Sequence, residues 1–345
     1  MKNRRKIAHN APSIGRAEVG GVKRVLKRNW LSPGVEVLNF EAELANYLGV
    51  NPKSVIAVQS GSAALFLAVS SLASENQEVY VPAYSCNAVK NSVKLVENKL
   101  IAVDIPGEGP NIDSSCITNV GGESIVILVS TFGIPGNPQK MDQHQVIEDF
   151  SQALGASIGE RKIGTLGRLG VVSFSATKLI TTAGMGGAIV CEDESLIQEI
   201  RSLCDYDSSF DSNSRFNFKM TDLQAAYGRV QLKNYPKFLE KRQQIFSIYE
   251  KIGLPLMRNS TPNSEFVPYR AIIKTADPIV IKQKLKMQGI ESILPYTSDE
   301  LQINQSEFPN SFKLCNSALS LPIYPSLSLR DARRIAEIAY DAIVL

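Results

Sequence analysis

Two charged residues follow apolar segments that have the composition of buried β-strands. Lys178 comes shortly after residues 170–175, and Asp149 closes the segment 146–149. A lysine amine can form a Schiff base with an aldehyde, and a carboxylate can keep a pyridine nitrogen protonated. Pyridoxal phosphate needs both groups, so these residues favour that cofactor. A lone lysine at a strand end is usually a solvated surface residue, and the prediction therefore depends on the surrounding residues.

The segment 59–65, Gln-Ser-Gly-Ser-Ala-Ala-Leu, joins a predicted strand to a predicted helix. Gly61 allows a tight turn, and the backbone N–H groups of Ser62 and Ala63 would open the helix toward an anion. This arrangement suits a phosphate group, to which the hydroxyl of Ser173 could donate a hydrogen bond. The same residues also suit an ordinary turn and helix cap, and a strand serine can equally face the other way.

Tyr84 and Cys86 follow another apolar segment and could cover a cofactor ring, although packing is the alternative for both. The carboxylates Glu148 and Asp149 are consecutive, and strand alternation places them on opposite faces. Only one of them can therefore serve the site. An aspartate after a strand is also a common helix cap, which is compatible with either function.

Short apolar segments recur along the first 191 residues, with helix-like stretches between some of them. Strands are predicted at 54–58, 78–81, 100–103, 125–130, 145–147, 170–175 and 187–191, and helices at 62–73 and 87–96. Several of these strands are apolar on successive residues, as strands covered on both faces should be. The alternation predicts an α/β fold with a mostly parallel sheet, whose ligands bind at the carboxyl ends of the strands.

The connection 131–144 is short for a parallel crossover and carries three helix breakers in its first half, so we expect it to lack a full helix. Beyond residue 220 the pattern becomes helical. We predict a large cofactor-binding α/β domain over 1–235, of which the first ~30 residues are free to pack elsewhere, and a smaller α+β domain over 236–345. The predicted elements of this part are helices at 221–232, 236–251, 277–288 and 329–343 and a strand at 268–273.

The composition excludes several classes of protein. The 345 residues carry 37 basic and 34 acidic side chains, a balance that gives no reason to expect nucleic-acid binding. The longest apolar runs have the length of strands, which predicts no membrane span. Five cysteines without a CxxC spacing indicate reduced thiols in a cytoplasmic protein, and two histidines argue against a histidine-rich metal site.

An ordered set of motifs runs from about Ile14 to the C-terminus. The motifs are Gly-Ser-Ala-Ala-Leu, Val-Pro-Ala-Tyr-Ser-Cys, Val-Ile-Glu-Asp-x-x-Gln-Ala, Ser-Phe-x-x-x-Lys, Gly-Gly-Ala-Ile-Val, Asn-Phe-Lys-Met-Thr-Asp-Leu-Gln-Ala-Ala and Leu-Pro-Ile-Tyr-Pro. Together they resemble the DegT/DnrJ/EryC1/StrS family of sugar aminotransferases, which are fold-type I pyridoxal phosphate enzymes. The order is more specific than any single motif.

The resemblance implies a role for each matching residue. Lys178 matches the lysine that forms the Schiff base, Asp149 the partner of the pyridine nitrogen, and Gln152 the polar residue near the phenolic oxygen of the ring. Lys178 would also shuttle the proton between substrate and cofactor carbons. Related dehydratases carry histidine instead of this lysine, so Lys178 argues against that class.

The phosphate contacts of the family match Gly61, Ser62 and Ser173. Asn217 matches an asparagine that reaches the phosphate of the neighbouring subunit, so the resemblance implies a homodimer with composite active sites. It also implies transfer of an amino group from glutamate or glutamine to a keto group of a nucleotide-linked sugar, in surface polysaccharide or natural-product sugar biosynthesis.

The chain departs from the family pattern at four places, one of which is the shortened connection before Asp149. Lys219 stands where arginine is expected, Cys86 stands where an aromatic residue often lies against the ring, and the loop after Ile290 lacks an aromatic and histidine cluster. Two alternatives follow. One is an aminotransferase for a non-nucleotide carbonyl such as a cyclitol ketone, and the other is a non-catalytic regulator that binds pyridoxal phosphate.

Overall fold

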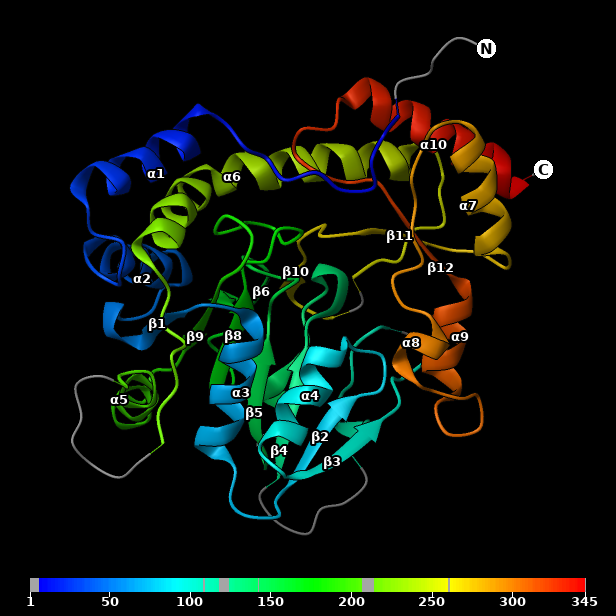
Figure 1. Cartoon of the computed structure of the whole chain (residues 1–345). Helices are drawn as coiled ribbons and strands as arrows, with labels where there is room; N and C mark the ends of the chain where they lie inside the picture. The colour runs from blue at the N-terminus through cyan, green and yellow to red at the C-terminus, as the bar shows by residue number, and fades with distance from the viewer. Residues whose placement is uncertain are drawn as a thin grey trace.

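The computed structural model describes residues 6–344 except 108, 118–123, 142, 207–213 and 260 (Figure 1). Its central sheet has seven strands in the order β1-β9-β8-β5-β4-β2-β3. The strands are β1 (Val55–Val58), β2 (Glu78–Pro82), β3 (Lys99–Val103), β4 (Ile125–Val129), β5 (Gln145–Asp149), β8 (Leu169–Ser173) and β9 (Gly187–Val190). Each begins and ends within two residues of the predicted position.

The predicted mostly parallel sheet is confirmed. Parallel pairing joins β3, β2, β4, β5 and β8. β9 runs antiparallel to both of its neighbours, β8 and β1. The connection from β8 to β9 can therefore be a loop without a crossover helix, and this loop carries Lys178.

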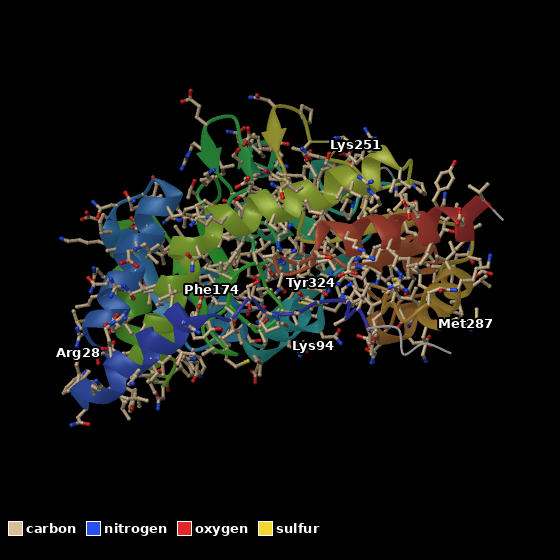
Figure 2. All side chains as sticks on the ribbon, turned by 90° about the horizontal axis from the view of Figure 1, so that it is seen from above. Arg28, Lys94, Phe174, Lys251, Met287 and Tyr324 are labelled. Carbon is tan, nitrogen blue, oxygen red and sulfur yellow. The ribbon has the colours of Figure 1, made fainter. Side chains whose placement is uncertain are left out.

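The helices of the described chain cover both faces of the sheet and extend beyond it (Figure 1). They are α1 (Arg16–Arg28), α2 (Val35–Leu48), α3 (Gly61–Leu72), α4 (Asn87–Leu95), α5 (Glu194–Leu203), α6 (Asp222–Lys251), α7 (Pro278–Met287), α8 (Ser298–Leu301), α9 (Pro309–Ser317) and α10 (Leu329–Val344). Seen from above (Figure 2), α1 with Arg28 lies at one end of the molecule and α7 with Met287 at the other.

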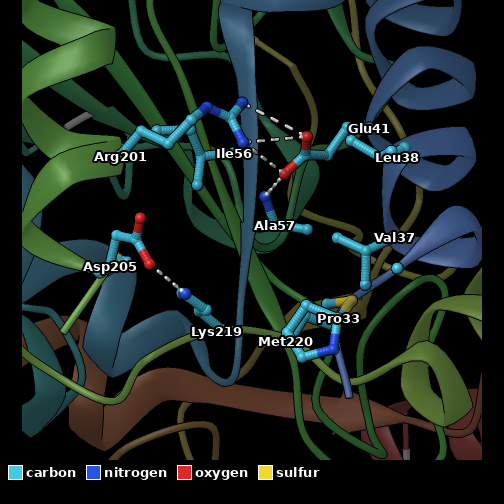
Figure 3. Close-up of a pocket in the computed structure, with 12 residues that line it drawn as sticks. Pro33, Val37, Leu38, Glu41, Ile56, Ala57, Arg201, Asp205, Lys219 and Met220 are labelled. Atoms are coloured by element: carbon cyan, nitrogen blue, oxygen red, sulfur yellow. Dashed lines mark hydrogen bonds and ion pairs between the residues drawn. The ribbon is translucent and has the colours of Figure 1, made fainter. Parts of the chain in front are cut away.

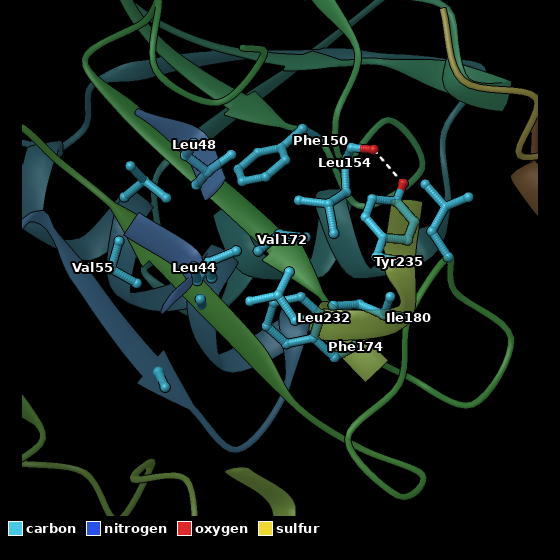
Figure 4. Close-up of a cluster of buried hydrophobic side chains, with 14 of the residues drawn as sticks. Leu44, Leu48, Val55, Phe150, Leu154, Val172, Phe174, Ile180, Leu232 and Tyr235 are labelled. Atoms are coloured by element: carbon cyan, nitrogen blue, oxygen red, sulfur yellow. Dashed lines mark hydrogen bonds between the residues drawn. The ribbon is translucent and has the colours of Figure 1, made fainter. Parts of the chain in front are cut away.

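Successive strand residues pack on opposite faces of the sheet, as their continuous apolar runs predict. Ile56, Ile127 and Ile147 pack with α3, α4 and α5 on one face. The other face is shared by two cores: α2 and α6 cover β1, β8 and β9, whereas segments after residue 256 cover β2 and β4. Figure 4 shows the core under α6, where the Tyr235 hydroxyl donates to the Leu154 carbonyl.

The crossover from β4 to β5 contains two short 3₁₀ turns, Thr131–Gly133 and Pro138–Lys140, and no α-helix among its described residues. The prediction of a shortened connection is confirmed. The turns end close to the sheet, and the Phe132 N–H donates to Gln152 Oε1 at 2.9 Å. The short crossover thus contacts a predicted site residue directly.

α6 is one helix of 30 residues, whereas two helices separated near Pro236 are predicted from the sequence. It begins with a capping box between Thr221 and Gln224 and continues through Pro236. Proline normally breaks a helix, but here the residues on both sides are held by packing, with Tyr235 in one core and Ile245 in another. The proposed domain boundary at 235/236 therefore falls inside a continuous helix, and the division into two domains stays a prediction.

The C-terminal part has its own core around the antiparallel pair β11 (Ala271–Lys274) and β12 (Ala318–Leu321), packed with α7, α10 and the end of α6. The N-terminal arm joins it, because Ile7 bridges to Ile290 and its N–H donates to the Gly289 carbonyl at 2.8 Å. Figure 1 shows this arm crossing the top of the molecule toward α1. The arm therefore links the C-terminal core to α1.

Candidate active site

β5 ends in two carboxylates that have different partners. Glu148 is buried and accepts hydrogen bonds from the N–H groups of Gly164, Leu166 and Gly167 at 3.0, 2.7 and 2.6 Å. Burial raises the pKa of Glu148, and these three donors partly offset that effect. Asp149 is also buried, and it accepts from the Ser151 N–H at 3.0 Å. Glu148 thus holds the loop that precedes β8, which leaves Asp149 as the carboxylate on the side of Lys178.

Lys178 lies in the loop from β8 to β9 and is half-buried. The loop is held by its own backbone, since the Lys178 N–H donates to Ser175 O and the Thr182 N–H donates to Phe174 O. The Lys178 ammonium lies 5.8 Å from the centroid of the Tyr269 ring. The lysine of this loop therefore lies close to an aromatic residue of the C-terminal part.

Cys86, at the N-cap of α4, interacts with both charged groups of the predicted site. Burial raises the pKa of the Cys86 thiol, the Asp149 carboxylate raises it further, and the Lys178 ammonium lowers it. All three side chains are therefore close enough to interact electrostatically, which is the arrangement that the sequence predicts for them.

Gln152 connects the sheet to two tyrosines. Its Nε2 donates to the Tyr296 hydroxyl at 3.5 Å, and the Tyr296 ring packs edge-on against Tyr84 at 5.1 Å between centroids. Tyr84 is fully buried, and its hydroxyl has no hydrogen-bond partner among the described residues. Burial raises the pKa of both phenols, so Tyr84 and Tyr296 are neutral. The Tyr84 ring packs beside the site as an aromatic wall.

The N-terminus of α3 lies against β8 and β9. A methyl group on Gly61 would approach Ser173 Cβ to 2.5 Å, and one on Gly187 would approach Ser60 O to 2.5 Å. Glycine is needed at both positions, because the Ser173 side chain lies against Gly61 and the Ser60 backbone lies against Gly187. The Ala63 N–H donates to Ser60 Oγ at 3.1 Å, whereas the N–H groups of Gly61 and Ser62 belong to a first helical turn that offers them no intrahelical acceptor.

Asn217 is exposed and lies outside this cluster within its own chain. The segment around it is fixed to the end of β1, because the Gln59 N–H donates to Phe218 O at 2.7 Å. Lys219, at the position where arginine is expected, forms an ion pair with Asp205 at 2.6 Å. These contacts hold the segment in place and leave the Asn217 side chain at the surface.

A cavity of about 290 Å³ lies beside this segment, between α2, β1 and α5 (Figure 3). Its charged groups are paired with one another: Arg201 lies 3.3 Å from Glu41, and Lys219 lies 2.6 Å from Asp205. Lys178 and Asp149 do not line it. The cavity is separate from the cluster that contains the lysine.

Four residues of the cluster escape prediction from the sequence: Tyr269, Arg270, Tyr296 and His9. Burial alone would raise the pKa of Tyr269, but Lys178, Arg270 and Arg242, together with a hydrogen bond to Thr177, outweigh it and lower the pKa. None of the four lies in a recognisable motif. Only tertiary packing brings them to the lysine.

The donor set fits pyridoxal phosphate. An amine, a buried carboxylate and an amide converge in Lys178, Asp149 and Gln152, and a close-packed glycine turn opens α3 at Gly61. These groups match the aldehyde, the ring nitrogen, the phenolic oxygen and the phosphate of the cofactor. Within the described residues there is no group of three or more His, Cys, Asp or Glu side chains placed to hold a metal ion.

The sequence profile of the DegT/DnrJ/EryC1/StrS aminotransferase family matches residues 12–339. The chain belongs to this family. It is an aminotransferase with the fold-type I architecture, and its cofactor is pyridoxal phosphate. No helix among the described residues has the length and apolar character that crossing a membrane requires.

Individual relatives match nearly the whole chain. A UDP-4-amino-4,6-dideoxy-N-acetyl-beta-L-altrosamine transaminase of Campylobacter jejuni is 30% identical, with 97% of each chain covered. A dTDP-4-dehydro-2,3,6-trideoxy-D-glucose 4-aminotransferase of Saccharopolyspora spinosa is 26% identical, with 94% of each chain covered. The crystal structure of the aminotransferase TlmJ from Streptoalloteichus hindustanus superposes with a TM-score of 0.89 at 22% identity over 99% of both chains. This chain thus shares the fold of that structure over nearly its whole length.

Proposed function

We propose that this aminotransferase transfers an amino group from glutamate or glutamine to a keto group of a nucleotide-linked sugar, in the biosynthesis of a surface polysaccharide or a natural-product sugar. The observation that carries the proposal is similarity over nearly the whole chain to enzymes named for dTDP- and UDP-linked sugars. The cluster of Lys178, Asp149 and Gln152 supplies the chemistry that such a transfer needs.

Each residue of the cluster has a distinct task in this proposal. Bound pyridoxal phosphate supplies an aldehyde that carries the amino group and a ring that withdraws electrons. Asp149 holds the proton on the ring nitrogen, and Gln152 orients the ring through its amide. Lys178 Nζ would take a proton from the substrate carbon and pass it to the cofactor carbon that carried the aldehyde, which requires the neutral amine.

The phosphate is proposed to bind at the start of α3. The N–H groups of Gly61 and Ser62 and the hydroxyl of Ser173 are its donors. Ala63 is a weaker candidate than the sequence suggests, because its N–H already donates to Ser60 Oγ. Tyr84 and Cys86 form the wall beside the ring, with Cys86 in the place of an aromatic residue.

The proposed assembly is a homodimer in which Asn217 reaches the phosphate of the partner subunit. Two features support it. Asn217 is exposed, and a set of large apolar side chains on α1, α2 and the turn between them is exposed as well. This set comprises Val19 (61%), Leu26 (52%), Trp30 (59%), Leu31 (48%), Val35 (52%) and Leu38 (63%). Apolar surface of this kind marks contacts between proteins.

Sedimentation of the wild type and of Leu38→Asp tests the dimer. A dimer for the wild type and a monomer for the variant are expected, whereas a monomeric wild type would overturn the composite site. We also propose a cytoplasmic location, which is supported by five cysteines that are all free.

The first experiment follows the absorbance of the cofactor-loaded protein after addition of L-glutamate or L-glutamine. Conversion of the cofactor to its amino form by one of them identifies the donor. The amino form is then mixed with 4-keto sugars linked to dTDP, UDP or GDP, and with a cyclitol ketone. Return of the original band with a nucleotide sugar is expected, return with the cyclitol ketone alone would favour that alternative, and no response to any donor would favour the regulator.

A further inference from the structure

We infer that Arg270 binds the α-carboxylate of the amino-acid donor. This inference rests on the proposed function and adds a residue that no family motif in the sequence contains. The Arg270 guanidinium carbon lies 5.3 Å from the centroid of the Tyr269 ring, and the Lys178 ammonium lies 5.8 Å from the same centroid. The Tyr269 ring therefore lies close to both the reactive amine of Lys178 and a second, permanently charged group.

The positive charge of Arg270 interacts with the tyrosines that line the site. Its guanidinium opposes the effect of burial on the pKa values of Tyr84 and Tyr296, the two phenols that pack against each other beside Gln152. Tyr296 also interacts with Cys86, which in turn interacts with Asp149 and Lys178. Arg270 thus belongs to the same electrostatic cluster as the residues that hold the cofactor.

Arg270 has no carboxylate partner among the described residues. It is half-buried, and its hydrogen bond runs from Nη1 to His9 Nε2 at 3.5 Å. Burial lowers the pKa of His9 to about 3, with a further contribution from Arg270, so the imidazole is neutral at ordinary pH. The partner of the guanidinium is therefore uncharged, and the positive charge of Arg270 remains available to an anion.

The backbone of Arg270 is held rigidly. Arg242 of α6 is fully buried, and its Nη1 donates to the carbonyls of Pro268, Tyr269 and Ile323 at 3.3, 3.1 and 2.9 Å. These bonds fix the residues that precede Arg270 to the long helix. His9 is fixed as well, since its Nε2 lies 2.9 Å from Ser320 Oγ. A cation on a fixed backbone loses less conformational entropy when it binds a ligand than one on a flexible segment.

An α-carboxylate is the anion that fits this position. In every amino acid it is attached to the carbon that bears the amino group, so it must lie close to the place where the amine reacts, beside Lys178. A guanidinium binds a carboxylate through two parallel hydrogen bonds, which also fixes the orientation of the donor. A keto group on a sugar ring has no such charge, so Arg270 would act in the donor half of the reaction.

The test compares the cofactor-loaded wild type with Arg270→Gln, Arg270→Lys and Arg258→Gln. Arg258 is an exposed arginine, 3.7 Å from Glu250, and is the matched control. The half-saturating concentrations of L-glutamate and L-glutamine are measured from the absorbance change in single-turnover experiments. Arg270→Gln should raise both by about 10- to 100-fold, Arg270→Lys by less because it keeps the charge, and Arg258→Gln should change neither.

A second measurement does not depend on turnover. Calorimetric titration with glutarate, a dicarboxylate without an amino group, should detect binding to the wild type and a loss of affinity of similar size in Arg270→Gln. The cofactor absorbance and the thermal midpoint of each variant show whether the site is intact. The amino form of Arg270→Gln should still react with the neutral keto group of an accepted sugar at the wild-type concentration dependence.

Unchanged half-saturation for both donors in Arg270→Gln would overturn the inference, and so would an effect on glutamate alone, which would assign Arg270 to the side-chain carboxylate. A wild type that reacts with no amino acid would instead overturn the proposed function. The two failures are therefore distinct.

Discussion

Glu148 and Asp149 are consecutive residues of β5, yet their carboxylates have unrelated partners. Glu148 accepts hydrogen bonds from three backbone N–H groups of residues 164–167, whereas Asp149 interacts with Cys86 next to Lys178. Strand geometry explains the difference, because successive side chains point to opposite faces. One carboxylate holds a loop and the other serves the site.

Substitution of these two residues should therefore give opposite results. Asp149→Asn should lower kcat by about 10²- to 10³-fold, the loss typical of one preorganised electrostatic partner, with little change in stability. Glu148→Gln should leave kcat near the wild-type value but lower the free energy of unfolding by about 1–3 kcal/mol, because the new amide group faces N–H donors. Steady-state kinetics and urea unfolding of both variants check the pair; a large kcat loss in Glu148→Gln alone would reverse the assignment.

Lys178→Ala should remove the absorbance of the lysine-bound cofactor and slow transamination by at least about 10²- to 10⁴-fold, because the variant lacks both the amine and the proton carrier. The spectrum and the single-turnover rate are the measurements. Lys162→Ala is a suitable control, since that lysine donates to the Gly155 carbonyl away from the site. Transamination that survives in Lys178→Ala would contradict the proposed mechanism.

Gly61→Ala should weaken cofactor binding and lower the free energy of unfolding by about 1–3 kcal/mol, the usual effect of overpacking. The reason is steric, because the new methyl group would approach Ser173 Cβ to 2.5 Å. The double variant Gly61→Ala with Ser173→Gly should recover stability, since the obstructing side chain is gone. Equilibrium dialysis with pyridoxal phosphate and thermal unfolding measure the two effects of the single variant. Only stability is expected to recover in the double variant, which lacks the Ser173 hydroxyl, and no recovery of stability would show that the contact is not the cause.

Stability should fall as the pH decreases from about 6.5 toward 3, in part because of His9. Burial lowers the pKa of His9 in the folded protein from 6.5 to about 3. Between these pH values the unfolded chain binds the additional proton, so the contribution of His9 is complete above pH 6.5 and is lost as the pH falls. His9→Gln should therefore show a shallower loss of stability in this range than the wild type.

Urea unfolding at pH 7, 6, 5 and 4 provides the comparison. The other groups that titrate in this range are the same in both proteins, so their effects on stability cancel in the difference between the two curves. Parallel curves for the wild type and His9→Gln would show that the histidine does not remain neutral in the folded state.

Most of the sheet could be predicted from the sequence because its strands are apolar on both faces. The direction of β9 could not, since a four-residue apolar run such as Gly187–Val190 reads the same in either orientation. The continuity of α6 through Pro236 cannot be predicted from the sequence either. Proline disfavours a helix locally, whereas Tyr235 and Ile245 are held by packing against residues that are distant in the sequence.

Most of the predicted cofactor residues share a simple property: they lie at or soon after the end of a strand, or at the start of a helix. Lys178, Asp149 and Gly61 could be found for this reason, and the structure places them around one region. Arg270, Tyr269 and His9 come from segments without such signals. The N-terminal arm reaches the site through its pairing with residues near Ile290 and through Asn10, whose side chain donates to Thr177 O. Contacts of this kind are formed by the tertiary fold, and no local sequence pattern predicts them.

α6 has a consequence for the way the protein unfolds. At 1.5 Å per residue its 30 residues span about 45 Å, and the helix contributes Leu232 and Tyr235 to one core and Ile245 and Phe246 to the other. Neither core can unfold without exposing apolar residues of α6, which belongs to both. We therefore expect amide hydrogens of β8 and β11 to exchange in a single cooperative event with the same opening free energy, although the two strands lie in separate sheets.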